Sequence, residues 1–127
     1  MLMFRKIPIS IVTFLILSSC YEPQRDCKAF KDGEFSFTTN INEKEATTTF
    51  IRQGGLEIDY FNGLIDSSSV RWINDCEYIV KKLHPRNKAE ERSVHMKILT
   101  TSDNSYTFEY NIVGDNNKST GVAKKTN

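Results

Sequence analysis

Along most of the chain, apolar and polar residues alternate with a period of two. Tyr106, Phe108 and Tyr110 form the clearest run of this kind, and comparable runs recur after residue 33. Because successive side chains of a strand point to opposite faces, this period is typical of β-strands, whereas a helix would show a period of 3.6 residues. We therefore expect strands within residues 34–38, 46–52, 56–60, 70–72, 76–81, 94–98, 106–110 and 119–125.

Short polar or glycine-containing segments separate these runs. Gly54 and Gly55 have the sequence of a tight hairpin turn. The most charged segment, residues 84–92, is expected to form a long hairpin loop. Asn87 followed by Glu90 has the spacing of a helix cap, so a single helical turn is expected inside this loop.

Strand-sized runs joined by frequent turns predict an all-β fold. The arrangement favoured is an antiparallel meander of about eight strands that forms a closed or partly closed, lipocalin-like barrel. A closed barrel of this size has no edge strands and has room for side chains or one small ligand. An open curved sheet or a small sandwich is the alternative, and no helix of normal length is expected.

The first twenty residues carry a different pattern. Arg5 and Lys6 precede an apolar run over residues 7–17, which has the length of a signal-peptide core and is short for a membrane-spanning helix. Residues 17–20, Leu-Ser-Ser-Cys, resemble the bacterial lipobox. The resemblance implies cleavage before Cys20 and attachment of acyl chains such as palmitate to that cysteine. An ordinary secretory signal with a chance cysteine is the alternative.

The lipobox divides the chain into three parts. Residues 1–19 are expected to be a lipoprotein signal peptide, residues 20–27 a lipidated N-terminus with a short tether, and residues 28–127 a single β domain. Several acyl chains on one residue anchor a protein firmly, because each buried methylene contributes about 0.8 kcal/mol. Tyr21, rather than an aspartate, follows Cys20. By analogy with other lipoproteins this favours the outer membrane over the inner membrane.

With Cys20 assigned to lipid, Cys27 and Cys76 remain. In an exported protein an even pair of cysteines indicates a disulfide bond. In the chain-entropy model a loop of this length would stabilise the fold by about 4 kcal/mol. Free thiols are one alternative, and a metal site that adds His84 and His95 is another, although no Cys-x-x-Cys or His-x-x-x-His spacing supports it.

Charge and motif content restrict the function. The chain has 17 Lys and Arg against 16 Asp and Glu, so it lacks the basic excess of a nucleic-acid-binding protein. His84 and His95 have no nucleophile at an interpretable spacing, and no cofactor motif is present. Glu57 and Asp59 share a strand face and have the chemistry for acid–base work, but the solvated face of a strand is the preferred interpretation. We therefore expect no enzyme, cofactor or metal.

Residues 69–78 are the densest segment in unusual side chains. In one interpretation this segment is a ligand site, in which Arg71 binds an anion and the rings of Trp72 and Tyr78 form the walls. In the other interpretation Trp72 is a core residue that packs beside the disulfide. The aromatic side chains of the predicted strands, taken together, fit either the lining of an apolar pocket or ordinary core packing. The candidates for ligand site or core are Arg71, Trp72, Tyr78, Tyr60, Phe108 and Tyr110.

Besides the lipobox and Cys27, residues 33–35, 70–78 and 97–101 carry a resemblance to a known family. On these segments the chain resembles small uncharacterised bacterial lipoproteins of a Gram-negative-type envelope, over essentially its whole length. Members are sometimes labelled "DNA topoisomerase IV". The residues contradict that label, because one near-neutral exported domain cannot supply the nucleotide-binding and metal-binding domains and the tyrosine nucleophile of such an enzyme.

Two function classes remain open for such a lipoprotein. The first is a binding module that holds a small apolar or amphipathic ligand inside the barrel or curved sheet. The second is a surface or periplasmic protein that docks an envelope protein or has a structural role, and an enzyme is a distant third. A cavity lined by aromatic residues would favour the first class, and an exposed aromatic patch would favour the second.

Overall fold

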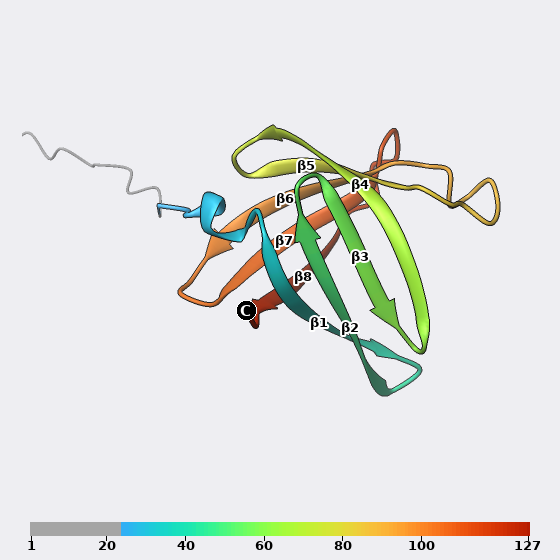
Figure 1. Ribbon diagram of the computed structural model, residues 1–127, viewed down its shortest axis with the longest axis horizontal. Helices are drawn as coiled ribbons and strands as arrows, with labels where there is room; N and C mark the ends of the chain where they lie inside the picture. The colour runs from blue at the N-terminus through green and yellow to red at the C-terminus, as the bar shows by residue number, and fades with distance from the viewer. Residues whose placement is uncertain (1–23) are drawn as a thin grey trace, which may run out of the picture.

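The computed structural model describes residues 24–127, and the lipobox with Cys20 lies outside them. Eight antiparallel strands follow one another around a closed barrel (Figure 1). The elements are a 3₁₀-helix η1 (Cys27–Phe30) and the strands β1 (Gly33–Ile41), β2 (Lys44–Gln53), β3 (Leu56–Phe61), β4 (Leu64–Asn74), β5 (Glu77–Lys82), β6 (Val94–Thr101), β7 (Ser105–Ile112) and β8 (Ser119–Lys125). Within residues 24–127, no helix is long and apolar enough to cross a membrane.

The barrel closes because β1 has two strand neighbours. Residues 33–41 of β1 pair with residues 44–52 of β2, and residues 35–37 pair with residues 123–125 of β8. Each strand from β2 to β7 pairs antiparallel with the next one in the sequence. The expected all-β meander is thus confirmed, in its closed form rather than as an open sheet or a sandwich.

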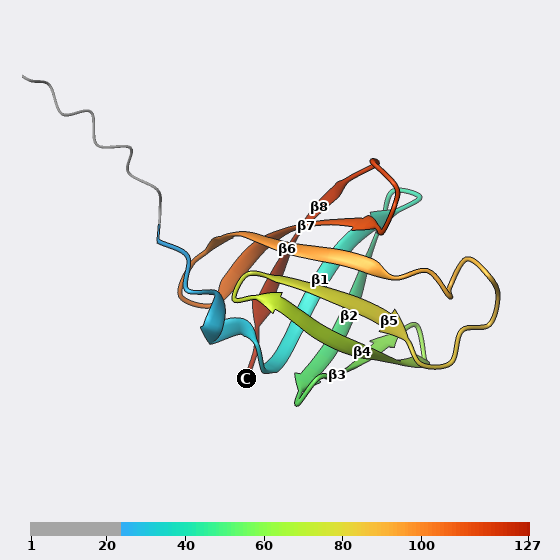
Figure 2. The same ribbon diagram turned by 90° about the horizontal axis from the view of Figure 1, so that it is seen from above.

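The two ends of the barrel differ. Helix η1, the C-terminus and the short turns after β2, β4 and β6 lie at one end (Figure 2). The turns after β1, β3 and β7 and the long loop of residues 83–93 lie at the other. We call the first end closed, because Cys27 and Phe30 of η1 are buried against it, and the second end the mouth.

The residues before η1 already contact the barrel. The guanidinium of Arg25 donates a hydrogen bond to the carbonyl of Ile98 at 2.9 Å, and the backbone N–H of Asp26 donates to the Thr101 hydroxyl at 2.9 Å. Part of the segment expected to be a tether is therefore docked on β6.

Aromatic side chains form most of the core toward the closed end. Phe35 stacks on Phe50 with ring centroids 5.0 Å apart, and Tyr106 meets both Phe30 and Phe35 edge-on, at 5.2 and 5.9 Å. Such pairs contribute about 0.5–1.5 kcal/mol each beyond the area they bury. The alternating aromatic positions of β1, β2 and β7 thus supply the packing that the sequence pattern predicts.

A glycine on β8 makes room for two of the inward-facing rings. A Cβ atom at Gly121 would lie 2.6 Å from Phe37 and 2.7 Å from Phe108. Real Cβ atoms do not approach other heavy atoms so closely, so a larger residue would displace both rings from their edge-on contact at 5.3 Å. Gly121 therefore sets how far these rings extend into the barrel.

The disulfide between Cys27 and Cys76 is confirmed. Its Cα atoms are 5.2 Å apart, and the bond joins η1 to the turn between β4 and β5. Trp72 packs against the same core cluster, as expected for a ring near the disulfide. Because both sulfur atoms are in this bond, neither is free for the alternative metal site.

The orientation of β3 differs from the expectation. Leu56 and Tyr60 face outward and are 38 % and 39 % exposed, whereas Glu57 is only 8 % exposed. The two-residue turn at residues 54–55 pairs Arg52 with Glu57 and Phe50 with Asp59. Directly opposite residues share a sheet face, so the inward direction of Arg52 and Phe50 forces both carboxylates into the barrel. Placing the pair on a solvated face was wrong, as was counting Tyr60 as core or ligand site.

Candidate functional site

A cavity occupies the half of the barrel nearer the mouth. Its volume is about 420 Å³, and all strands except β8 contribute to its wall. Seven of the lining side chains are aromatic, and four carry a titratable acidic or basic group other than tyrosine. The lining residues are Phe37, Thr48, Phe50, Glu57, Asp59, Phe61, Asp66, Tyr78, Lys82, Val94, Met96, Tyr106, Phe108 and Tyr110.

Beneath this cavity lies a buried arginine. Arg52 of β2 is 1 % exposed, and its guanidinium makes five hydrogen bonds at N···O distances from 2.5 to 3.4 Å. The acceptors are the carbonyls of Phe30 and Lys31, the hydroxyls of Tyr78 and Tyr106, and the carboxylate of Glu57. A guanidinium has five N–H donors. All five are therefore engaged, and the arginine links η1 to strands β3, β5 and β7.

Aromatic faces complete the surroundings of Arg52. The guanidinium carbon lies 4.8 Å from the ring centroids of both Phe35 and Tyr78 and 5.5 Å from that of Trp72. Burial alone would lower the pKa of Arg52, but the nearby oxygens of Tyr78, Tyr106 and Glu57 offset this effect and leave the pKa raised. Arg52 therefore stays charged and forms a fixed floor beneath the cavity.

The carboxyl groups of β3 are perturbed by their enclosure. Burial raises the pKa of Glu57, and the adjacent guanidinium of Arg52, at 3.3 Å, lowers it only in part. Burial, followed by the charges of Glu57 and Asp66, raises the pKa of Asp59 to about 7. Among residues 24–127, no side chain or backbone group forms a hydrogen bond or ion pair with the Asp59 carboxyl. The cavity thus holds one carboxyl without a partner.

At the mouth, an ion-pair network ties the long loop to the barrel. Lys82 lies 3.4 Å from Asp66 and 2.8 Å from Glu90, and Arg86 donates two 3.1 Å hydrogen bonds to Asp66. The Glu90 backbone N–H donates to the Asn87 side chain at 2.9 Å, which confirms the expected turn inside the loop. The hydrogen bond from Lys82 is the main cause of a lowered pKa at Glu90. Residues 83–93 are therefore held beside the cavity entrance.

Three of the residues selected from the sequence line this cavity, namely Tyr78, Phe108 and Tyr110. Trp72 lies below it, with its ring centroid 4.4 Å from that of Tyr78 and the ammonium of Lys31 5.2 Å from its own centroid. Trp72 is thus core that supports the floor rather than a wall of the site.

The other selected residues lie outside the cavity. Arg71 is exposed on the outer face of β4, so it does not anchor an anion inside, and Tyr60 is on the outer face of β3. His84 is exposed in the loop. His95 lies between two cavity-lining residues of β6 and therefore faces outward, with its Nε2 3.3 Å from a carboxylate oxygen of Glu77.

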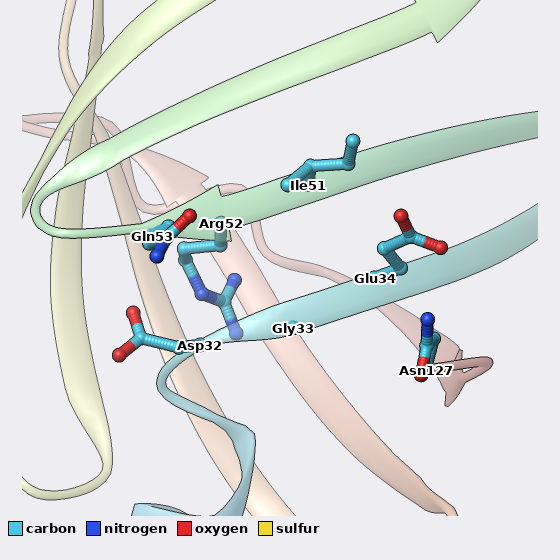
Figure 3. Close-up of a pocket in the computed structure, with 7 residues that line it drawn as sticks. All are labelled: Asp32, Gly33, Glu34, Ile51, Arg52, Gln53 and Asn127. Carbon is cyan, nitrogen blue, oxygen red and sulfur yellow. The ribbon is translucent and has the colours of Figure 1, made fainter.

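A further hollow of about 400 Å³ lies at the closed end, beside the C-terminus (Figure 3). Its edges come from the start of β1 and the end of β2, with Asp32, Glu34, Gln53 and Asn127 as its polar side chains. Arg52 also borders it, but its donors are already used by the contacts described above. The hollow therefore offers no free cation to a ligand.

The sequence contained a signal that Glu57 and Asp59 face the interior of the barrel, and the prediction for β3 missed it. Phe50 is an apolar residue of the strand that precedes Gly54 and Gly55, and these two glycines indicated a two-residue turn. Together these fix the register and place Asp59 opposite Phe50. The role of Arg52 had no comparable signal, because three of its hydrogen-bond partners are distant in the sequence: the carbonyls of Phe30 in η1 and of Lys31 just after it, and the hydroxyl of Tyr106 in β7.

Comparison with models of known families, with curated proteins and with solved structures gives no match for this chain. Within residues 24–127, no group of three or more His, Cys, Asp or Glu side chains is arranged to hold a metal ion. The candidate site is therefore defined by its geometry, a closed barrel that holds an aromatic cavity above a buried arginine.

Proposed function

We propose that this protein is a membrane-anchored envelope lipoprotein whose barrel binds a small apolar or amphipathic ligand without transforming it. The observation that carries the proposal is the cavity of about 420 Å³. Pockets for small ligands commonly measure about 300–1,000 Å³, are mainly apolar, and have a few placed polar groups. Seven aromatic rings and a small set of charged groups match that description.

The location of the aromatic residues favours a binding module over a docking protein. Among the large apolar side chains exposed in residues 24–127, Tyr60 is the single aromatic one. The aromatic side chains otherwise face the interior, where the rings line the cavity or the core beneath it. An exposed aromatic patch, which would indicate a protein partner, has no support in this part of the chain.

A lipid on Cys20 would orient the barrel. Six residues lie between Cys20 and Cys27 of η1, and the seven Cα–Cα steps that join the two cysteines span at most about 25 Å. The closed end would then stay near the membrane, and the mouth, at the opposite end of the barrel, would point away from it (Figure 2). A ligand would enter from the aqueous side.

The lipid anchor has a direct test. We expect Cys20→Ser to abolish metabolic labelling with a palmitate analogue and to release the protein from the membrane fraction, because that sulfur carries the lipid in the lipobox interpretation. Cys27→Ser, which removes a cysteine of the disulfide instead, should keep the label. Labelling that persists in Cys20→Ser would contradict a lipid anchor on Cys20. The proposal that the barrel binds a ligand does not depend on this result and is tested separately.

Ligand binding is tested by filling the cavity. The neutral fluorescent probe N-phenyl-1-naphthylamine should bind the purified protein in phospholipid nanodiscs saturably, above the signal of empty nanodiscs. Met96 lines the cavity, so Met96→Trp should weaken binding at least about tenfold by occupying the free volume. Val122→Trp is the matched control, because Val122 is on the outer face of β8 and 51 % exposed.

Thermal unfolding followed by circular dichroism checks that both variants fold. Val94→Phe, a smaller addition to the cavity wall, provides a second blocking variant if Met96→Trp is unstable. Equal probe affinity in the wild type and in a folded blocking variant would refute the proposed site.

A further inference from the structure

The wall of the cavity has an excess of acidic groups. Three carboxyl groups line it, those of Glu57, Asp59 and Asp66, against the single ammonium group of Lys82. Asp59 and Asp66 are directly paired across β3 and β4, so two of the carboxylates stand side by side on the same wall. Like charges in that position repel each other.

The cations near the cavity are already bonded to other groups. Arg52 has all five donors engaged below the floor. Lys82 donates to Asp66 and to Glu90, and Arg86 is also bonded to Asp66. An anionic ligand would therefore meet no uncommitted guanidinium and would face carboxylates at close range, which costs free energy in an enclosed site.

Asp59 is the carboxyl that these cations leave without a partner. It lies on the cavity wall, opposite Phe50 on one side and Asp66 on the other. Within the described residues no donor reaches its oxygens. The side chain is only partly buried, so its oxygens are accessible from the cavity, and an ionised carboxylate there can accept a hydrogen bond from a ligand.

We infer that the cavity takes an amphipathic organic cation, an amine whose ammonium group meets Asp59 and whose apolar body lies among the aromatic rings. The inference rests on the proposed function and names its ligand class. An ammonium–carboxylate contact is a charge-assisted hydrogen bond, stronger than a neutral one. Tyr110, Phe61 and Phe37 offer further ring faces to the cation and to its apolar body.

Titration of Asp59 gives the inference a pH signature. Its charged neighbours are Glu57 on its own strand and Arg52, Asp66 and Lys82 on strands β2, β4 and β5. Tyr78, Tyr106 and Tyr110 are the other titratable residues that line the same cavity. Burial and the acidic neighbours raise the pKa of Asp59 to about 7. An alkylamine remains protonated through this range, as lysine does. Amine binding should thus become about tenfold tighter between pH 6 and pH 8, as the carboxyl ionises.

Three probes with the same ring separate charge from apolar binding. They are 2-(1-naphthyl)ethylamine, which is cationic, 2-(1-naphthyl)ethanol, which is neutral, and 1-naphthaleneacetate, the conjugate base of 1-naphthaleneacetic acid, which is anionic. By isothermal titration calorimetry at pH 8, we expect the amine to bind at least tenfold more tightly than the alcohol, and the anion to bind most weakly. The alcohol should show no change in affinity between pH 6 and pH 8.

Asp59→Asn isolates the proposed contact. It should remove the preference for the amine and the pH dependence, while the affinity for the alcohol stays within about twofold of the wild type. Glu109→Gln is the matched control, because it removes a carboxylate that is bonded to Lys118 on the outer face of β7. It should keep both the preference and the pH dependence.

The Asn variant is expected to fold. A folded-state pKa above the unfolded value means that Asp59 contributes stability at low pH, and that this contribution is lost as the pH rises through about 7. At pH 8, Asp59→Asn should therefore unfold at a temperature no lower than the wild type.

The outcomes distinguish the two proposals. If the alcohol binds as tightly as the amine, or the anion binds best, the ligand class is overturned while the barrel remains a binding module. If none of the three probes binds, and N-phenyl-1-naphthylamine does not bind either, the proposed function fails and the inference fails with it. If Glu109→Gln abolishes the amine preference as Asp59→Asn does, the preference reflects overall charge and the contact with Asp59 is refuted.

Discussion

Replacing Arg52 with alanine should lower the free energy of unfolding by about 3–5 kcal/mol, the range for removing one member of a buried ion pair. The substitution would leave the buried carboxylate of Glu57 without its cation and would remove the partner of four other buried oxygens. It would also detach η1 from the barrel floor, since two of those oxygens are the carbonyls of Phe30 and Lys31. Chemical unfolding followed by the fluorescence of Trp72, the single tryptophan, measures the change.

Arg71→Ala is the matched control for this prediction. Arg71 is exposed on the outer face of β4, so its loss should change the free energy of unfolding by less than about 0.5 kcal/mol. The double variant Arg52→Met with Glu57→Leu should recover part of the loss, because it removes both buried charges together. An Arg52→Ala protein within about 1 kcal/mol of the wild type would show that the guanidinium does not hold the floor.

Loss of the disulfide should be the second large effect. The Cys27–Cys76 bond closes a loop of 49 residues, for which the chain-entropy model gives about 4 kcal/mol. We expect Cys27→Ser with Cys76→Ser to lower the free energy of unfolding by that order, measured as above. Releasing η1 would also weaken the hydrogen bond from Arg52 to the Phe30 carbonyl and the one from the Asp26 backbone N–H, just before η1, to the Thr101 hydroxyl of β6.

Reduction of the wild-type protein provides the control for the double variant. Dithiothreitol should bring the wild type to the stability of the double variant and should leave the variant itself unchanged. A double variant as stable as the oxidised wild type would show that the covalent link contributes nothing that packing does not already supply.

Much of the fold was predictable because its determinants are local in the sequence. The alternation at Phe35 and Phe37, and again at Tyr106 and Phe108, fixes which side chains enter the core. The turn at residues 54–55 ends one strand and begins the next, so the strand order followed from the sequence. The pairing of Cys27 with Cys76 followed from the number of cysteines and from the expectation, drawn from the lipobox, that the protein is exported.

The candidate site was predictable only in part, since it depends on how the barrel closes. Tyr78, Phe108 and Tyr110 were selected as core or site and do line the cavity. For β3 the apolar face was assumed to be the inner face, whereas the pairing of Arg52 with Glu57 turns the acidic face inward. That ion pair is stable inside because η1 and two tyrosine hydroxyls use the remaining donors of Arg52. No pattern of neighbouring residues in the sequence predicts such a set of contacts.

The position of Met96 allows one direct test of ligand binding in the barrel. The chain has three methionines, and Met96 is the one within the described residues, where it lines the cavity. With methyl-¹³C-methionine labelling, its resonance is assigned by its loss in Met96→Leu. Titration with 2-(1-naphthyl)ethylamine at pH 8 should shift this resonance saturably in the wild type and much more weakly in Asp59→Asn. A Met96 resonance that stays unmoved at saturating amine would show that the amine does not bind inside the barrel and would contradict this ligand site.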